Sequence, residues 1–145
     1  MKHFIAIVLA MAPMAVHAGE SFQATNTYVT ESKAWPVDQA TGYWMVAFEG
    51  VSQVTEGPID TMRVECHGAG FWGPGGLDGG GICIHGEGDD TFILRFDSKP
   101  DGNTWTILSG TGKYQGLTGS GTAVTEALAG NRRISELVGD VSLGN

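Results

Sequence analysis

The fold is decided by residues 60–97, DTMRVECHGAGFWGPGGLDGGGICIHGEGDDTFILRFD. In residues 60–67 apolar side chains alternate with polar or charged ones, which is the period-two pattern of a half-buried strand. Segments 81–86 and 91–97 are predicted strands on either side of an acidic, glycine-containing turn at 87–90. The stretch therefore predicts consecutive antiparallel strands.

A register for these strands follows if the two cysteines face each other. Placing Cys66 opposite Cys83 puts Val64 opposite His85. The turn that follows then puts His85 opposite Phe92. All of these side chains fall on one apolar face, because alternate residues of a strand share a face. We therefore expect His85 to point into the interior of the domain.

Five further segments have the composition or alternation of strands: 22–32, 42–50, 103–109, 122–129 and 132–143. The glycine-rich residues 68–80 predict a loop, and residues 113–116 predict a single turn. Eight strands with short connections predict one all-β domain over residues 19–145. The expected architecture is an eight-stranded antiparallel up-and-down β-barrel, calycin-like, with a β-sandwich as the alternative. Such a barrel is either filled with side chains or holds one small ligand.

Residues 1–18 have the three parts of a signal peptide. Lys2 and His3 form a basic start, residues 4–16 are apolar apart from one proline, and Val16 and Ala18 are small residues at the cleavage positions. The apolar run is shorter than the roughly 20 residues that a membrane-spanning helix needs. We therefore expect a signal peptide, no membrane span, and a periplasmic or secreted protein.

Cys66 and Cys83 are the only cysteines of the chain. An even number of cysteines in an exported chain predicts a disulfide, which would stabilise the domain by roughly 3 kcal/mol. The alternative is a metal site that adds His67 and His85, but the short spacing typical of zinc ligands is absent. Cys66 and His67 would also point to opposite faces of a strand. We expect a disulfide, no metal and no cofactor.

Composition and charge narrow the classes of partner. The 145 residues include 16 Asp and Glu against 8 Lys and Arg, a formal net charge of -8. Such a surface repels nucleic acids and anionic lipids, so neither is an expected partner. The 23 glycines also argue against a mostly helical protein.

Residues 110–121, GTGKYQGLTGSG, resemble a glycine-rich segment of the allene oxide cyclase-like and dirigent-like β-barrels, in particular their small exported bacterial members. The resemblance implies a barrel in which Tyr114 plugs or stacks beneath one end. It also implies cyclase activity on an unsaturated fatty-acid epoxide, or the guiding of radical coupling. The functional residues of these families have no counterparts that can be matched one by one in this chain, and one fold carries many functions.

Residues able to carry chemistry are few. His85 is the candidate general acid or base, because an unperturbed histidine titrates near pH 6.5, and its alternative role is a hydrogen-bonded core residue. No nucleophile elbow surrounds Ser120. Glu87, Asp89 and Asp90 form an acidic turn without the spacing of a calcium loop.

Aromatic side chains are the candidates for gripping a ligand at the mouth or inside of the barrel. The candidate ligand-binding residues are Trp44, Trp72, His85, Phe92 and Tyr114. Trp44 is an expected core residue, whereas Trp72 lies in the predicted loop and either holds a ligand or anchors that loop.

Three functions remain compatible with these residues. The preferred one is a binding module that holds a small apolar ligand or docks to a partner in the cell envelope. A cyclase or isomerase acting in the barrel cavity is the first alternative, since such chemistry needs little more than a shaped pocket. A secreted protease inhibitor or other interaction protein is the second. The oligomeric state is not indicated by the sequence.

Overall fold

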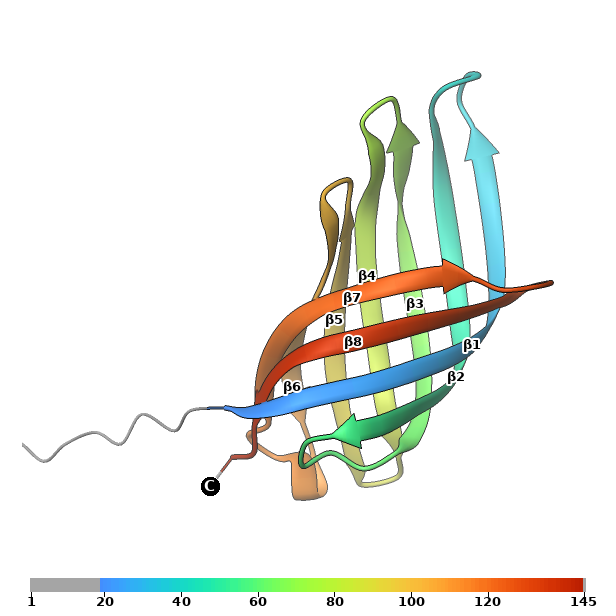
Figure 1. The fold of residues 1–145 in the computed structure, drawn as a ribbon. Coiled ribbons are helices and arrows are strands. Elements are labelled where there is room, and N and C mark those ends of the chain that lie inside the picture. Colours follow the sequence, from blue (N-terminus) through green and yellow to red (C-terminus); the bar gives the residue numbers. More distant parts are fainter. Residues whose placement is uncertain (1–18, 145) are drawn as a thin grey trace, which may run out of the picture.

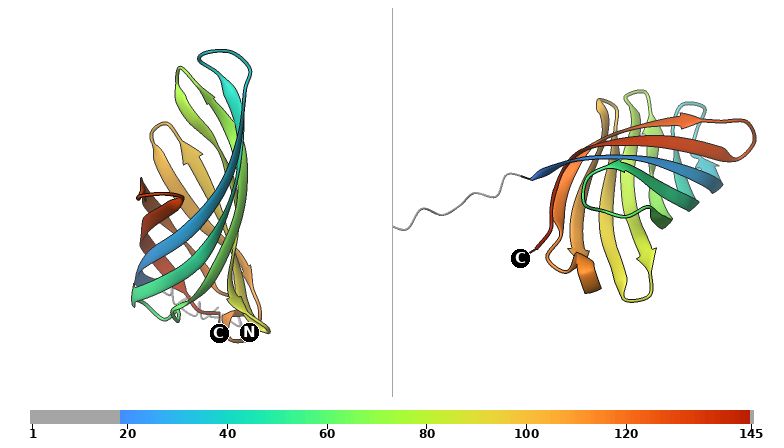
Figure 2. Two further views of the ribbon diagram at one scale, coloured as in Figure 1. Left: turned by 90° about the vertical axis from the view of Figure 1, so that its right-hand side faces the viewer. Right: turned by 60° about the horizontal axis from the view of Figure 1, so that its bottom comes forward.

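The computed structural model describes residues 19–144, which form a closed barrel of eight strands. Each strand pairs in antiparallel fashion with the next, and the last strand returns to the first, as Figures 1 and 2 show. The strands are β1 (Glu20–Pro36), β2 (Gly42–Glu56), β3 (Met62–Gly73), β4 (Gly76–Glu87), β5 (Asp90–Lys99), β6 (Gly102–Gly110), β7 (Thr118–Ala127) and β8 (Arg132–Ser142). The predicted up-and-down barrel is confirmed, and the sandwich alternative is wrong.

The register expected for the central strands is also confirmed. Cys66 pairs with Cys83 and Val64 with His85 between β3 and β4. His85 then pairs with Phe92 between β4 and β5. All five side chains are buried, so they form part of the barrel interior.

The loop predicted over residues 68–80 is wrong, because this segment continues β3 and β4 as one long hairpin. The pairing of Cys66 with Cys83 extends without a break to Trp72 and Leu77, and only a tight turn separates the two strands. Glycine there leaves space on the inner face of the sheet and does not break the strands.

Aromatic rings occupy the space that these glycines leave. A Cβ atom added to Gly70 would lie 2.7 Å from Cζ2 of Trp44, and one added to Gly79 would lie 2.6 Å from the same atom. The ring of Trp105 covers Gly121 and Gly139 in the same way, at 2.7 and 2.6 Å. The high glycine content therefore serves close packing of aromatic rings against the sheet.

One end of the barrel is plugged. The connection between β6 and β7 contains a short 3-10 helix, η1 (Gly112–Tyr114), and Tyr114 is buried beneath the strands. The backbone N–H of Asp60 donates a hydrogen bond to the Tyr114 hydroxyl over 3.2 Å. Lys113 forms an ion pair with the Asp60 carboxylate. These contacts fix the β6–β7 and β2–β3 connections to each other across the plugged end.

The opposite end carries the turns of the β1–β2, β3–β4 and β5–β6 hairpins, which extend beyond the body of the barrel (Figure 1). The expected signal peptide, residues 1–18, lies outside the described residues. Between residues 19 and 144, no helix has the length and apolar character needed to cross a bilayer.

Candidate ligand-binding cavity

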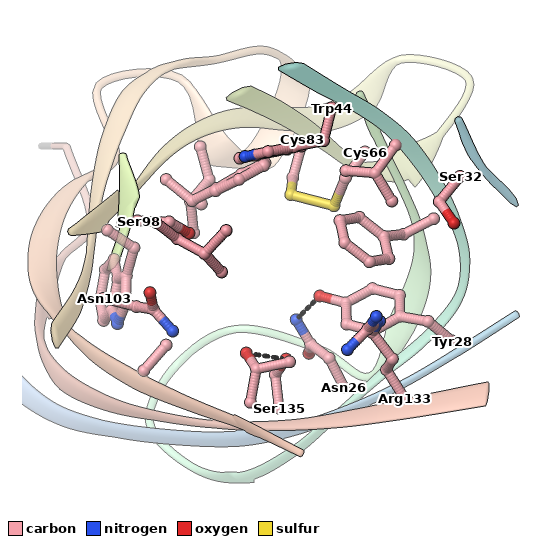
Figure 3. Close-up of a pocket in the computed structure, with 18 of the residues that line it drawn as sticks. Asn26, Tyr28, Ser32, Trp44, Cys66, Cys83, Ser98, Asn103, Arg133 and Ser135 are labelled. Carbon is pink, nitrogen blue, oxygen red and sulfur yellow. Dashed lines mark hydrogen bonds between the residues drawn. A yellow bond between two sulfur atoms is a disulfide. The ribbon is translucent and has the colours of Figure 1, made fainter. Parts of the chain in front are cut away.

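The barrel encloses a cavity of about 430 Å³ that is lined by side chains from all eight strands (Figure 3). Volumes of this size are typical of pockets for small organic molecules, about 300–1,000 Å³. The plug at Tyr114 lies outside the lining, whereas Trp72 and Leu77 of the extending β3–β4 hairpin belong to it. The cavity therefore lies toward the end of the barrel opposite the plug.

Strands β2 to β6 supply the apolar part of the wall. Trp44, Val46 and Phe48 line the cavity from β2, and Leu94 and Phe96 line it from β5. These are inward positions that alternation in the sequence predicts. The cavity therefore offers an apolar and largely aromatic surface on this side.

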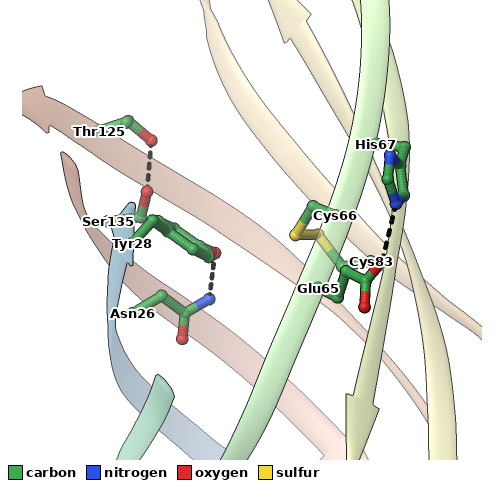
Figure 4. The surroundings of a disulfide bond; sticks show 8 residues. All are labelled: Asn26, Tyr28, Glu65, Cys66, His67, Cys83, Thr125 and Ser135. Carbon is green, nitrogen blue, oxygen red and sulfur yellow. Dashed lines mark hydrogen bonds and ion pairs between the residues drawn. A yellow bond between two sulfur atoms is a disulfide. The ribbon is translucent and has the colours of Figure 1, made fainter. Parts of the chain in front are cut away.

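The predicted disulfide is confirmed and lies on the same wall. Cys66 and Cys83 are joined with an S–S distance of 2.05 Å, and both residues are buried. On the outer side of β3, Glu65 forms ion pairs with Arg63 and His67, as Figure 4 shows for His67. His67 therefore points away from the two sulfur atoms, which agrees with the expectation that neighbours in the strand face opposite sides.

Strands β1, β7 and β8 supply a polar wall that the sequence reasoning missed. Asn26 Nδ2 donates a hydrogen bond to the Tyr28 hydroxyl over 2.6 Å, and the hydroxyls of Thr125 and Ser135 lie 2.7 Å apart (Figure 4). Burial raises the pKa of Tyr28 to about 12, so its phenol keeps its proton at neutral pH. Arg133 lies on the same side of the cavity, on β8.

An available signal for the polar wall was the alternation in β1. Phe22, Ala24, Asn26, Tyr28 and Thr30 are all buried at every second position. Extending the same parity rule to β1 and β8 places Asn26, Tyr28, Arg133 and Ser135 inside the barrel. Polarity made these residues look like surface residues, although their position in the strand is an inward one.

His85 lies in the lining of the cavity and is buried. Burial lowers its pKa to about 3, because removing water disfavours the charged imidazolium. His85 therefore departs from the unperturbed pKa near 6.5 on which its candidate role as a general acid or base was based. A neutral imidazole at this place can form a hydrogen bond with a ligand, but its protonation state does not change near neutral pH.

The other candidate residues divide into two groups. Trp44 and Trp72 line the cavity, Trp44 half-buried on β2 and Trp72 half-buried at the end of β3. Phe92 and Tyr114 do not line it. Their rings make an edge-to-face contact with centroids 5.5 Å apart in the plugged end. Phe92 and Tyr114 therefore help to close that end of the barrel.

Three buried polar atoms in the cavity wall have no hydrogen-bond partner within residues 19–144. They are Asn26 Oδ1, Trp44 Nε1 and His85 Nδ1. A buried polar group without a partner costs about 1–3 kcal/mol, so these atoms favour an occupant that bonds to them. Asn26 Oδ1 is an acceptor, Trp44 Nε1 is a donor, and His85 Nδ1 is an imidazole nitrogen. The three atoms come from different strands around the same cavity. The arrangement can thus hold an apolar molecule and orient it by a few polar contacts.

Comparisons of the chain with models of protein families, with curated proteins and with solved structures found no match. The resemblance of residues 110–121 to the allene oxide cyclase-like and dirigent-like barrels stays a prediction.

Proposed function

We propose that the protein is a binding module that holds one small, largely apolar organic molecule inside the barrel. The observation that carries the proposal is the cavity of about 430 Å³ whose apolar wall is interrupted by unpaired, buried polar atoms. A side-chain-filled barrel would not have such a space. A ligand that fits would bury its apolar surface against Trp44, Phe96 and Leu94 while it pairs with Asn26, Trp44 or His85.

The two alternatives differ in their support from the cavity. A cyclase or isomerase needs a shaped pocket and one polar group, and the inward His85 with its lowered pKa supplies that group in the cavity, so this activity stays the second candidate. For a protease inhibitor, the segment expected to protrude as a loop, 68–80, is a paired hairpin with only a tight turn. Binding of a small molecule uses both the apolar wall and the unpaired polar atoms, and it requires no reaction.

We place this activity outside the cytoplasm, in the periplasm or the medium. The signal-like residues 1–18 motivate this proposal, and the Cys66–Cys83 disulfide is consistent with an oxidising compartment. N-terminal sequencing of the exported protein should begin at or near Gly19. Folded protein that keeps Met1 in the cytoplasm would contradict the proposed location.

The binding proposal is tested with a neutral, two-ring fluorescent probe, N-phenyl-1-naphthylamine. Wild-type protein should bind it saturably with one probe per chain. Ala123→Trp fills the cavity from β7 and should weaken binding by at least about tenfold, which corresponds to about 1.4 kcal/mol. Val124→Trp is the matched control, because Val124 is the next residue of the same strand and is 62% exposed.

The outcomes separate binding in the cavity from binding elsewhere. Val124→Trp should keep the wild-type affinity within about twofold, whereas the cavity variant should not. Circular dichroism checks that Ala123→Trp is folded, and Ser98→Trp, which fills the cavity from β5, provides a second obstruction. Equal affinity of wild type and both obstructed variants, or no binding to the wild type, would overturn the proposal.

A further inference from the structure

The inner wall of the barrel carries an arginine without a carboxylate partner. Arg133 has the same strand parity as the buried residues Ser135 and Leu137, and it pairs in register with Tyr28 of β1. It is half-buried and lines the cavity (Figure 3). No carboxylate of the described residues lies within 4.0 Å of its guanidinium.

Four other cations of the described residues are paired with carboxylates on the outside. Arg63 pairs with Glu65, Arg95 with Asp97, Lys99 with Asp78, and Lys113 with Asp60. Among the described residues, the cavity lining contains two cations, Arg133 and the exposed Lys33, and no Asp or Glu. In a chain with a net charge of -8, the cavity is thus a locally positive place. Low-polarity walls strengthen the attraction of an anion to such a place.

A second donor lies beside the arginine. The Tyr28 hydroxyl accepts a hydrogen bond from Asn26, so its own proton is available to another acceptor. Tyr28 is the register partner of Arg133, and both residues line the cavity. A guanidinium and a phenol on neighbouring strands form a donor pair that suits an oxyanion.

We infer that the natural ligand is an organic monoanion with an apolar body, and that Arg133, assisted by Tyr28, holds its carboxylate-like or sulfonate-like group. The apolar body lies against the disulfide and the aromatic wall of β2 to β5. This inference rests on the proposed function, since it assigns the chemical class of the ligand that the cavity takes. The net negative charge of the protein repels anions in general. Selectivity for an apolar monoanion therefore arises from the residues inside the barrel.

The test uses two probes that share their rings and differ in charge. N-phenyl-1-naphthylamine is neutral, and 8-anilinonaphthalene-1-sulfonate adds a sulfonate to the same scaffold. Arg133→Gln should weaken binding of the sulfonate by about 10–100-fold, the range for loss of a charged hydrogen bond. The same variant should bind the neutral probe within about twofold of wild type, which also shows that the cavity is intact.

Two controls locate the effect at the cavity. Arg132 is adjacent on β8 and exposed, so Arg132→Gln removes the same charge and should leave binding of the sulfonate within about twofold. Arg133→Lys keeps the charge and should retain binding of the sulfonate within about tenfold. Tyr28→Phe should weaken the sulfonate alone, by roughly fivefold, through loss of one hydrogen bond.

The remaining outcomes distinguish a failure of the anion site from a failure of ligand binding as a whole. Sulfonate affinity that is equal in wild type and Arg133→Gln, with neutral-probe binding unchanged, would overturn the inference and leave the binding module standing. Loss of both probes in Arg133→Gln would also overturn it, because the side chain would then support the cavity and not the anion. Failure of the wild type to bind the neutral probe would instead contradict the proposed function.

Discussion

His85 stacks on Phe92 with ring centroids 4.5 Å apart and ring planes 6° from parallel. The contact joins the cavity, which His85 lines, to the plugged end, where Phe92 packs against Tyr114. Burial keeps the imidazole in its neutral form, because the charged form would lose its solvation there. This buried histidine therefore acts as a polar contact and not as a switch near neutral pH.

Binding of a neutral probe should not depend on the charge of His85 between pH 5 and 8. Its pKa of about 3 lies far below this range, so the imidazole stays neutral throughout. The dissociation constant of N-phenyl-1-naphthylamine, measured by fluorescence titration at several pH values, should be constant within about twofold. A change of tenfold or more that disappears in His85→Gln would contradict the lowered pKa.

Stability, in contrast, should depend on His85 at acidic pH. The unfolded chain protonates this histidine near pH 6.5, whereas the folded chain does so only near pH 3. The unfolded state therefore binds more protons between these values, and the free energy of unfolding falls as pH decreases through this window. Between pH 7 and 5 the wild type should lose about 1–2 kcal/mol more than His85→Gln, measured by denaturant unfolding. Parallel curves for the two proteins would contradict the assignment.

The disulfide should contribute substantially to stability. Cys66 and Cys83 are 17 residues apart in the sequence and close a loop in the unfolded chain. Replacing both by serine should lower the free energy of unfolding by roughly 2–4 kcal/mol, since the unfolded state gains freedom. Chemical denaturation of oxidised wild type and double variant measures the difference. Two titratable thiols in native exported protein would show that the bond does not form.

Glycine on the inner wall should be sensitive to a single methyl group. A Cβ at Gly70 would lie 2.3 Å from the backbone oxygen of Asp78 and 2.7 Å from the Trp44 ring, so Gly70→Ala should cost about 1–3 kcal/mol. Gly75, in the turn of the same hairpin, meets nothing within 4 Å and provides the control Gly75→Ala, expected within about 0.5 kcal/mol of wild type. Thermal melts of both variants compare them, and equal melting temperatures would refute the close packing.

Tyr114 should matter for stability and not for binding. It packs in the plugged end against Phe92 and accepts a hydrogen bond from the Asp60 N–H, away from the cavity lining. Tyr114→Phe should cost about 1 kcal/mol and Tyr114→Ala about 3–5 kcal/mol. Binding of the neutral probe to Tyr114→Phe should stay within about twofold of wild type. A larger loss of affinity would place the ring in the ligand site.

The barrel and its central register could be predicted because their signals are local and periodic. Alternation in residues 60–67 and the pairing of two cysteines determine which side chains of β3, β4 and β5 face inward. The turn at Glu87–Asp90 supplies the second half of that register. A closed barrel is the arrangement that pairs both edges of such a sheet.

The hairpin at 68–80 was missed because glycine has low strand propensity and usually marks turns. Glycine is needed at positions 70 and 79 because the ring of Trp44, which is distant in the sequence, packs against both residues. Trp72 and Leu77 continue the Cys66–Cys83 register, and that continuity was the available signal. Packing against a distant aromatic ring thus outweighed local propensity.

The polar wall could not be read from composition alone. Asn26 and Arg133 are residue types usually found at the surface, and their inward position follows only from the parity of β1 and β8. The kinship of residues 110–121 with allene oxide cyclase-like and dirigent-like barrels, and the signal peptide at 1–18, remain predictions.

A crystal structure of the protein with N-phenyl-1-naphthylamine would show whether the barrel holds a ligand in its interior. We expect the probe between Trp44, Phe96 and Leu137, with its N–H within hydrogen-bond distance of Asn26 Oδ1 or His85 Nδ1. Side chains filling the cavity, with the probe only on the outer face of the strands, would show that the interior of the barrel is not a binding site.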